Sequence, residues 1–314
     1  MNRLMMKAIL EQVRAVLAND QAPVNATLLE AFGAIIDDVN LSPAFRAVAM
    51  ELPSERAVAD AMPIIDPAAT HRAREIVREA LGIRWHSKLV SVIDGCRLEG
   101  EYSPDSTSAG IRALKNTCYY YGVAAGNKTM VLRVRDQFNT AKQLVKAAFR
   151  CSKAEDIPSA VARAKNDTIV SALKEWYSEP LLVNKWLTIQ ATAPCFAGEA
   201  PVVTRVSELA NSPFFSMANP NNVYALLVAF FMNNPAEFHR LDGEGYKFWV
   251  ECVLKLDALN PQVASRVARS LENWRRYTPQ LSNLMFQALK HLERQEKLSV
   301  SVREIVEKAL NNPA

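Results

Sequence analysis

Residues 259–274 of the chain read Leu-Asn-Pro-Gln-Val-Ala-Ser-Arg-Val-Ala-Arg-Ser-Leu-Glu-Asn-Trp. Their large apolar side chains recur every three or four positions, the spacing that places them on one face of a helix: Val263, Val267, Leu271 and Trp274. Just before them, Asn260 offers a side-chain oxygen to an unpaired backbone N–H, and Pro261 has a φ that is already helical. This stretch therefore predicts an amphipathic helix that begins at Pro261.

The same pairing of a capping residue with proline occurs at seven other places: Ser42-Pro43, Asp66-Pro67, Ser103-Pro104, Ser212-Pro213, Asn219-Pro220, Asn234-Pro235 and Thr278-Pro279. So many pairs predict a protein built mostly of helices. Ser-Pro and Asn-Pro also begin plain turns. Asn234-Pro235 is the pair at which we most expect a turn, because little apolar periodicity surrounds it.

Runs typical of strands are rare. The two best ones, residues 89–93 and 130–134, are short and lie inside longer stretches compatible with helix. The sequence thus predicts an all-α fold. Helices joined by short loops, without a strict sequence period, are typical of antiparallel helix pairs stacked into an α-superhelix, a solenoid like those of ARM or HEAT repeats. No linker rich in Pro, Gly or Ser divides the chain, so we expect residues 1–314 to form a single helical superhelical domain.

The composition is that of an ordinary globular protein. Of the 314 residues, 49% are apolar and 22% charged, and the formal net charge is +4, which argues against disorder and against nucleic-acid binding. No apolar run approaches the roughly 20 residues that a membrane-spanning helix needs, so we expect no membrane partner. The five cysteines include no Cys-x-x-Cys pair. This indicates a reducing compartment, and we expect a cytoplasmic protein.

Familiar catalytic signatures are missing. The chain has no His-Glu-x-x-His zinc motif, no phosphate-binding loop and no Gly-x-Ser-x-Gly elbow. The histidines are His71, His86, His239 and His291. No two of them lie three or four residues apart, the spacing by which one helix supplies two zinc ligands. From the residues alone, the chain is a non-catalytic helical scaffold without a metal or cofactor of its own.

Several strings in the second half of the chain occur together, in this order, in one known family: Val183–Leu187, Gln190–Thr192, Ser216–Asn221, Asp242–Phe248 and Leu259–Arg266. Shorter strings of the first half agree with the same family: Asn2–Arg3, Leu52–Glu55, Ile65–Pro67 and Ala113–Thr117. Their order and spacing resemble the C-terminal helical domain of aminopeptidase N, an M1 family zinc metallopeptidase. The resemblance covers essentially the whole chain.

This resemblance implies that the chain is the last part of a longer polypeptide, in which a thermolysin-like catalytic domain holds the zinc ion. In the family, the helical domain closes over the catalytic domain and walls off the cavity that contains the active site. It thereby helps to select the peptides whose N-terminal residue is removed. The implied partners are the catalytic domain of the same polypeptide and the peptide substrate. This chain itself is expected to hold no zinc and to carry no catalytic residue.

Arg266 matches an arginine that faces this cavity in the family, where its guanidinium can pair with the carboxylate end or the backbone of a bound peptide. The resemblance places Asn219, Asn221, Asn222 and Tyr224 beside it, although Asn219 and Asn221 also suit a structural role at a helix start. In many bacterial relatives the positions of Asn222 and Tyr224 are arginines, so the cavity wall carries less positive charge here. The structural alternative for Arg266 is a helix cap or an ion pair between helices.

A second class of function stays open. A free-standing α-solenoid binds a protein or peptide on its concave face without belonging to an enzyme. The cluster of Arg266, Arg269, Arg275 and Arg276 around Trp274 is also a pattern found in nucleic-acid-binding proteins. Basic helix faces are usually solvated, however, and the neighbouring Glu272 weakens the case, so we expect no nucleic-acid partner.

Overall fold

The computed structural model describes residues 1–98, 103–140, 180–195 and 198–311. Within these ranges the regular structure is helical, and the one β-type pairing is an isolated bridge between Ile65 and Tyr277. The prediction of an all-α fold is confirmed. Residues 89–93 and 130–134, whose composition is typical of strands, lie in the helices α6 (His86–Gly95) and α8 (Lys128–Thr140). None of the described helices is long and apolar enough to cross a membrane.

The chain divides into two compact units. Unit 1 comprises Met1–Val58 and Ala69–Val170, and unit 2 comprises Ala59–Ala68 and Ser171–Ala314. The short segment 59–68 therefore belongs with the C-terminal helices, although it lies early in the sequence. That residues 1–314 act as a single domain stays a prediction.

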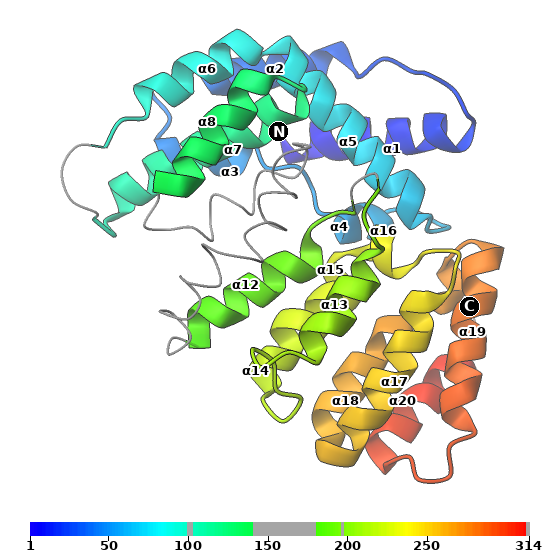
Figure 1. Cartoon of the computed structure of the whole chain (residues 1–314). Coiled ribbons are helices and arrows are strands. Elements are labelled where there is room, and N and C mark those ends of the chain that lie inside the picture. The colour runs from blue at the N-terminus through cyan, green and yellow to red at the C-terminus, as the bar shows by residue number, and fades with distance from the viewer. Residues whose placement is uncertain (99–102, 141–179, 196–197, 312–314) are drawn as a thin grey trace. The chain divides into compact units, whose positions relative to one another are not determined.

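Besides α6 and α8, unit 1 contains six described helices: α1 (Asn2–Leu17), α2 (Ala26–Asp37), α3 (Pro43–Ala49), α4 (Glu55–Asp60), α5 (Pro67–Arg84) and α7 (Ser106–Ala124) (Figure 1). Helices α4 and α5 extend into residues 59–68. Helix α7 packs against α3, α6 and α8. Its fully buried Tyr121 meets Phe32 edge to face, with ring centroids 4.8 Å apart, and donates its hydroxyl to the carbonyl of Met50. These contacts make α7 the centre of the unit 1 core.

Unit 2 is a stack of helices whose neighbours pack in pairs (Figure 1): α12 (Pro180–Thr192), α13 (Val202–Ala210), α14 (Pro220–Val223), α15 (Ala229–Asn233), α16 (Pro235–Phe238), α17 (Glu244–Leu259), α18 (Pro261–Ala268), α19 (Pro279–Glu293) and α20 (Val300–Asn311). A π-helix, Tyr224–Val228, joins α14 to α15, and two short 3₁₀ turns, Arg269–Leu271 and Trp274–Arg276, follow α18. Helix α12 packs against the π-helix and α15, α17 against α18, and α19 against α20. This arrangement confirms the ARM-like solenoid.

The residues quoted from 259–274 form the helix start that the sequence predicts. The Asn260 side chain accepts a hydrogen bond from the N–H of Val263 at 3.1 Å, and α18 begins at Pro261. Val263, Val267 and Leu271 are buried, and the carbonyl of Val267 accepts a hydrogen bond from the indole of the fully buried Trp249 at 3.1 Å. This hydrogen bond ties α17 to α18.

Six of the eight proline pairs begin a helix: those before α3, α5, α14, α16, α18 and α19. The expectation that Asn234-Pro235 forms a plain turn is wrong, because α16 starts at Pro235. The Asn234 side chain points elsewhere and donates to the carbonyls of Ala191 and Ala193 at the end of α12. Ser212-Pro213 lies in a turn, whereas Ser103-Pro104 lies in the irregular residues just before Asp105, which caps α7.

Candidate functional site

Arg266 lies on the solvent face of α18. Its neighbours Val263 and Val267 turn into the core, and the Arg266 side chain is exposed. Nη1 of Arg266 donates a hydrogen bond of 2.7 Å to the hydroxyl oxygen of Tyr224, and the guanidinium carbon lies 5.9 Å from the Tyr224 ring centroid. Among the described residues Arg266 forms no ion pair and caps no helix. The remaining N–H groups of its fork are therefore open to a ligand.

Tyr224 owes its place to an irregular helix. It is the first residue of the π-helix Tyr224–Val228, which continues α14 and leads into α15. A π-turn contains one more residue than an α-turn, and such insertions occur frequently at functional sites. Tyr224 is half-buried, whereas the residues after it, Ala225–Leu227, are buried in the unit 2 core. The helix irregularity thus accompanies the one residue that reaches Arg266.

Asn222 is buried and fully engaged. Its Oδ1 accepts a hydrogen bond from the N–H of Ser216 at 3.1 Å, and its Nδ2 donates to Oδ1 of Asn184 at 2.7 Å. Only 8% of the surface of Asn222 is exposed, and its role in a substrate cavity stays a prediction. Its partner Asn184, on α12, is half-buried and was not among the expected site residues, although it lies in the Val183–Leu187 string.

Asn219 and Asn221 form the helix start. The Oδ1 of Asn219 accepts the N–H of Asn221 at 3.0 Å, which caps α14 ahead of Pro220. The Asn221 side chain is exposed. Of the five expected site residues, the structure therefore brings together Arg266 and Tyr224, joins Asn222 to Asn184, and uses Asn219 as a cap.

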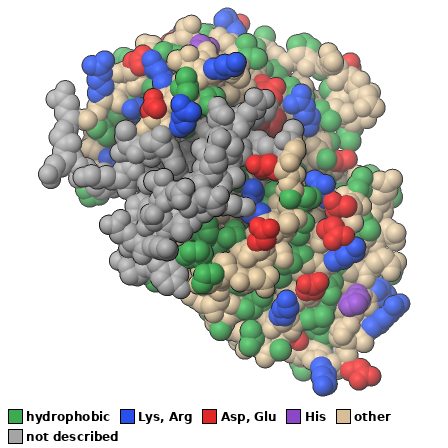
Figure 2. Space-filling model, in the orientation of Figure 1, with side chains coloured by type: hydrophobic (Ala, Val, Ile, Leu, Met, Phe, Trp, Pro, Cys, Tyr) green, Lys and Arg blue, Asp and Glu red, His purple; other side chains and the backbone are tan. Residues whose placement is uncertain are grey.

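The other arginines of the 266–276 cluster are engaged with the protein. Arg275 donates to the carbonyls of Ala309 and Leu310 at the end of α20, at 2.6 and 2.5 Å, and stacks on Trp274. Arg276 donates to carbonyls of segment 59–68, and Arg269 pairs with Glu272 at 3.4 Å. On the face shown in Figure 2, the described Lys and Arg side chains are interspersed with Asp and Glu. Arg266 is the member of the cluster that is free to meet a ligand.

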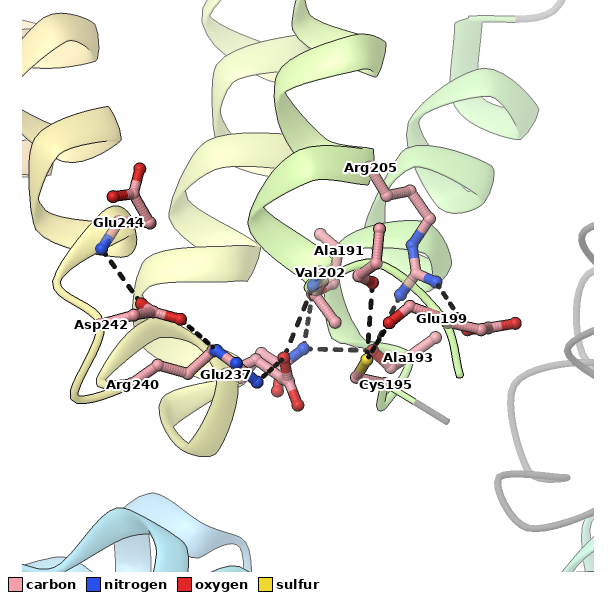
Figure 3. Close-up of polar contacts among 12 residues, drawn as sticks. Ala191, Ala193, Cys195, Glu199, Val202, Arg205, Glu237, Arg240, Asp242 and Glu244 are labelled. Atoms are coloured by element: carbon pink, nitrogen blue, oxygen red, sulfur yellow. Dashed lines mark hydrogen bonds and ion pairs between the residues drawn. The ribbon is translucent and has the colours of Figure 1, made fainter. Parts of the chain in front are cut away.

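A second polar group, drawn in Figure 3, joins helix ends. Arg205 of α13 donates to the carbonyls of Gln190 and Ala193, at 3.1 and 3.0 Å, and so caps the end of α12. The carboxylate of Glu237 lies 3.5 Å from the N–H of Val202 at the start of α13. These contacts give the charged side chains a structural role, in which each one satisfies a backbone group that the helix leaves unpaired.

Cys195 lies beside this group without the surroundings of a nucleophile. Its Sγ faces the carbonyls of Ala200 and Glu199, at 3.5 and 3.7 Å. Burial, together with the charge of Glu237, raises the pKa of the Cys195 thiol and keeps it protonated. No three His, Cys, Asp or Glu side chains among the described residues gather closely enough to hold a metal ion.

The Asp242–Phe248 string begins a helix. Gly243 has a φ of +73°, a left-handed conformation that glycine adopts without strain, and Asp242 Oδ1 accepts the N–H of Glu244 at 3.1 Å. At Gly245 a Cβ atom would lie 2.3 Å from the carbonyl oxygen of Phe238, so the backbone approach requires glycine. Both glycines serve the entry into α17.

Tyr246, from the same string, holds a buried histidine. Its hydroxyl lies 2.9 Å from Nδ1 of His239, and the His239 ring packs 4.6 Å from the ring of Tyr277. Burial lowers the pKa of His239 to about 3, so the imidazole is neutral. His239 is a core residue of unit 2.

Comparison with known proteins gives the chain a family. The family model described as "Domain of unknown function (DUF3458_C) ARM repeats" matches residues 1–311. Aminopeptidase N of Caulobacter vibrioides is 32% identical over 280 residues, 88% of this chain and 31% of that protein. Aminopeptidase N of Escherichia coli strain K12 is 32% identical over 284 residues, 90% of this chain and 31% of that protein.

Among solved structures, Legionella pneumophila aminopeptidase A in complex with aspartic acid has a TM-score of 0.80 and covers 98% of this chain, at 23% identity. This likeness shows the fold. It spans 36% of the Legionella chain, and our chain likewise spans about a third of the length of the aminopeptidase N relatives. The match of the family model over 1–311 decides the assignment, and the chain belongs to the DUF3458_C family of ARM-repeat domains.

Proposed function

We propose that this chain is the non-catalytic C-terminal domain of a zinc-dependent aminopeptidase N of the M1 family. In this role it encloses the active-site cavity of the longer enzyme and helps to select the peptides whose N-terminal residue is removed. The identity of 32% over about nine tenths of the chain supports homology, and the coverage of only 31% of the relatives supports a longer polypeptide. The partner is then the catalytic domain of the same polypeptide.

The observation that carries the proposal is the Arg266–Tyr224 pair. The Arg266 guanidinium is exposed, has no carboxylate partner among the described residues and is held at 2.7 Å by the Tyr224 hydroxyl, so it can pair with an incoming anion. The planar fork of arginine matches a carboxylate with two parallel hydrogen bonds. The free C-terminal carboxylate of a short peptide is such a group, and Arg266 then selects peptides over larger chains whose carboxylate lies far from the cleaved bond.

We assign the zinc ion to the catalytic domain and not to this chain. The described residues do not fit a zinc site, because no three potential ligands gather among them. When bound in the catalytic domain, zinc supplies a nucleophilic water for amide hydrolysis. The contribution of this chain is to bind and orient the peptide. We also place the enzyme in the cytoplasm, a proposal supported by the absence of a disulfide at the described cysteines Cys96, Cys118, Cys195 and Cys252.

Zinc content and hydrolysis test this division of labour. We expect the purified 314-residue chain to bind no stoichiometric zinc and to hydrolyse no alanine arylamide. The longer polypeptide should bind zinc and hydrolyse the arylamide. Metal-dependent turnover by the rigorously pure chain would contradict the proposal.

The alternative is a free-standing α-solenoid that binds a protein or peptide on its concave face. Sequencing the gene upstream of the Met1 codon separates the two functions. An in-frame segment with a His-Glu-x-x-His motif supports the enzyme domain, and a reading frame that starts at Met1 supports the scaffold.

A further inference from the structure

The hydrogen bonds around Asn222 fix which way two side-chain amides point. The N–H of Ser216 can only donate, so the atom of Asn222 that it meets at 3.1 Å is the amide oxygen. The amide nitrogen of Asn222 must then face Asn184, at 2.7 Å, and the atom of Asn184 that receives it must be oxygen. The NH₂ group of Asn184 is consequently turned away from Asn222.

That NH₂ group has no partner among the described residues, and Asn184 is half-buried. Its own backbone carbonyl already accepts a hydrogen bond from the hydroxyl of Thr188 at 3.0 Å. Asn184 therefore presents donors, while its acceptors are used inside the protein. A half-buried donor left in this state is ready for an acceptor on a ligand.

The pair formed by Arg266 and Tyr224, two residues along the chain from Asn222, has the same polarity. Arginine can only donate, so the Tyr224 oxygen is the acceptor of the 2.7 Å hydrogen bond and its own O–H is left to donate. The hydrogen bond of Asn222 reaches Asn184 on α12, and the hydrogen bond of Tyr224 reaches Arg266 on α18. The groups that remain available to a ligand on Asn184, Tyr224 and Arg266 are thus hydrogen-bond donors.

We infer that Asn184 is a specificity-determining residue of the proposed peptide site, where its NH₂ group donates to a main-chain carbonyl of the bound peptide and Asn222 is the positioning residue that orients it. This rests on the proposed function. A neutral amide donor suits a neutral carbonyl, whereas the charged fork of Arg266 suits the carboxylate. The ligand class is an extended peptide, read through its carbonyl groups by Asn184 and through its carboxylate by Arg266.

Asn184→Asp tests the assignment, because it keeps the size and the acceptor toward Asn222 but replaces the outward donors by an acceptor. Gln280→Glu is the matched control, since it makes the same change from amide to carboxylate at an exposed position of α19. Binding of tetra-alanine, as free acid and as C-terminal amide, is measured calorimetrically with the full 314-residue chain. We expect Asn184→Asp to weaken both peptides by roughly tenfold, the loss of one hydrogen bond plus repulsion between two acceptors. Gln280→Glu should stay within about twofold of the wild type.

The result that overturns the inference is equal binding by the Asn184→Asp and Gln280→Glu variants while Arg266→Ala still loses affinity for the free acid. In that case the proposed function survives and the role of Asn184 does not. If the wild-type chain binds neither peptide, the proposed function fails for this chain and the inference falls with it.

A second measurement does not depend on a variant that folds. In an NMR titration of the wild-type chain, the side-chain NH₂ signals of Asn184 should shift when the amidated peptide is added, and those of Gln280 should not. Unmoved Asn184 signals at saturating peptide contradict the inference.

The variant Asn222→Asp tests the positioning role of Asn222. With two carboxylate oxygens at position 222, the Asn184 amide turns its NH₂ group inward. We expect the affinity for both peptides to fall as it does in Asn184→Asp.

Discussion

The hydroxyl oxygen of Tyr224 accepts a 2.7 Å hydrogen bond from the guanidinium of Arg266, and this bond links the π-helix to α18 across 42 residues of sequence. The guanidinium is exposed but is held in one place by an uncharged partner. An acid in the position of Tyr224 would neutralise the charge, and an apolar residue would leave the long side chain mobile. A phenol does neither, which is why the pair suits the recognition of a carboxylate.

Replacing Tyr224 by Phe tests this anchoring. The variant loses the acceptor for Arg266 and keeps the ring, so we expect the affinity for free-acid tetra-alanine to fall by roughly two- to tenfold, the value of one hydrogen bond. In an Arg266→Ala background the same substitution should have little further effect, because the two residues act as a unit. Calorimetric titration of the four chains measures the coupling, and strict additivity would contradict it.

Gly245→Ala should destabilise the chain. A Cβ at this position would overlap the carbonyl oxygen of Phe238, at 2.3 Å, and the backbone of α16 or α17 must move to relieve it. We expect a loss of roughly 1–3 kcal/mol in the free energy of unfolding, measured with urea. Gly95→Ala is the control: nothing lies within 4 Å of its added Cβ, so it should be neutral or stabilising by up to about 1 kcal/mol.

The buried His239 predicts a pH dependence of stability. Its pKa is about 3 in the folded chain and about 6.5 when unfolded. Between these values the unfolded state binds more protons, so stability falls as pH decreases from 6.5 toward 3, with a slope from this group of up to about 1.4 kcal/mol per pH unit. Urea unfolding at several pH values should give a shallower slope for His239→Gln than for the wild type. The exposed His291→Gln should keep the wild-type slope, and identical slopes for all three proteins would refute the assignment.

Arg276 should hold segment 59–68 to the rest of unit 2. Its guanidinium donates to the carbonyls of Ala59 and Met62, at 3.1 and 2.7 Å, next to the backbone pairing of Ile65 with Tyr277. We expect Arg276→Ala to lower the free energy of unfolding by roughly 1.5–3 kcal/mol. Arg269→Ala removes only an exposed pairing with Glu272 and should cost less than about 0.5 kcal/mol. Equal losses of stability in the two variants would argue against this role of Arg276.

The helical fold could be read from local sequence because its signals are local. Asn260 and Pro261 define a helix start within a few residues, and Val263 and Val267 define its buried face. The same reasoning failed at Asn234-Pro235. There the helix is short and its periodicity weak, and the Asn234 side chain caps a helix that lies more than 40 residues earlier in the sequence.

The candidate site depends on contacts that no local pattern contains. Family resemblance pointed to Arg266 and Tyr224, but their direct hydrogen bond depends on the π-helix, and the sequence Tyr224–Val228 has no feature that distinguishes it from an α-helix. Asn184 was missed for a similar reason: its partner Asn222 is 38 residues away, and only their hydrogen bonds fix which way its amide points.

The most direct test of the central claim is the affinity of the 314-residue chain for tetra-alanine as free acid and as C-terminal amide, measured by calorimetry for the wild type, Arg266→Ala and Arg269→Ala. If Arg266 reads the peptide carboxylate, the wild type and Arg269→Ala bind the free acid at least about tenfold more tightly than the amide, as a charged hydrogen bond of roughly 1.5–3 kcal/mol requires. Arg266→Ala then binds both peptides equally. A preference for the free acid that survives in Arg266→Ala, or a wild type that does not distinguish the two peptides, would contradict the claim.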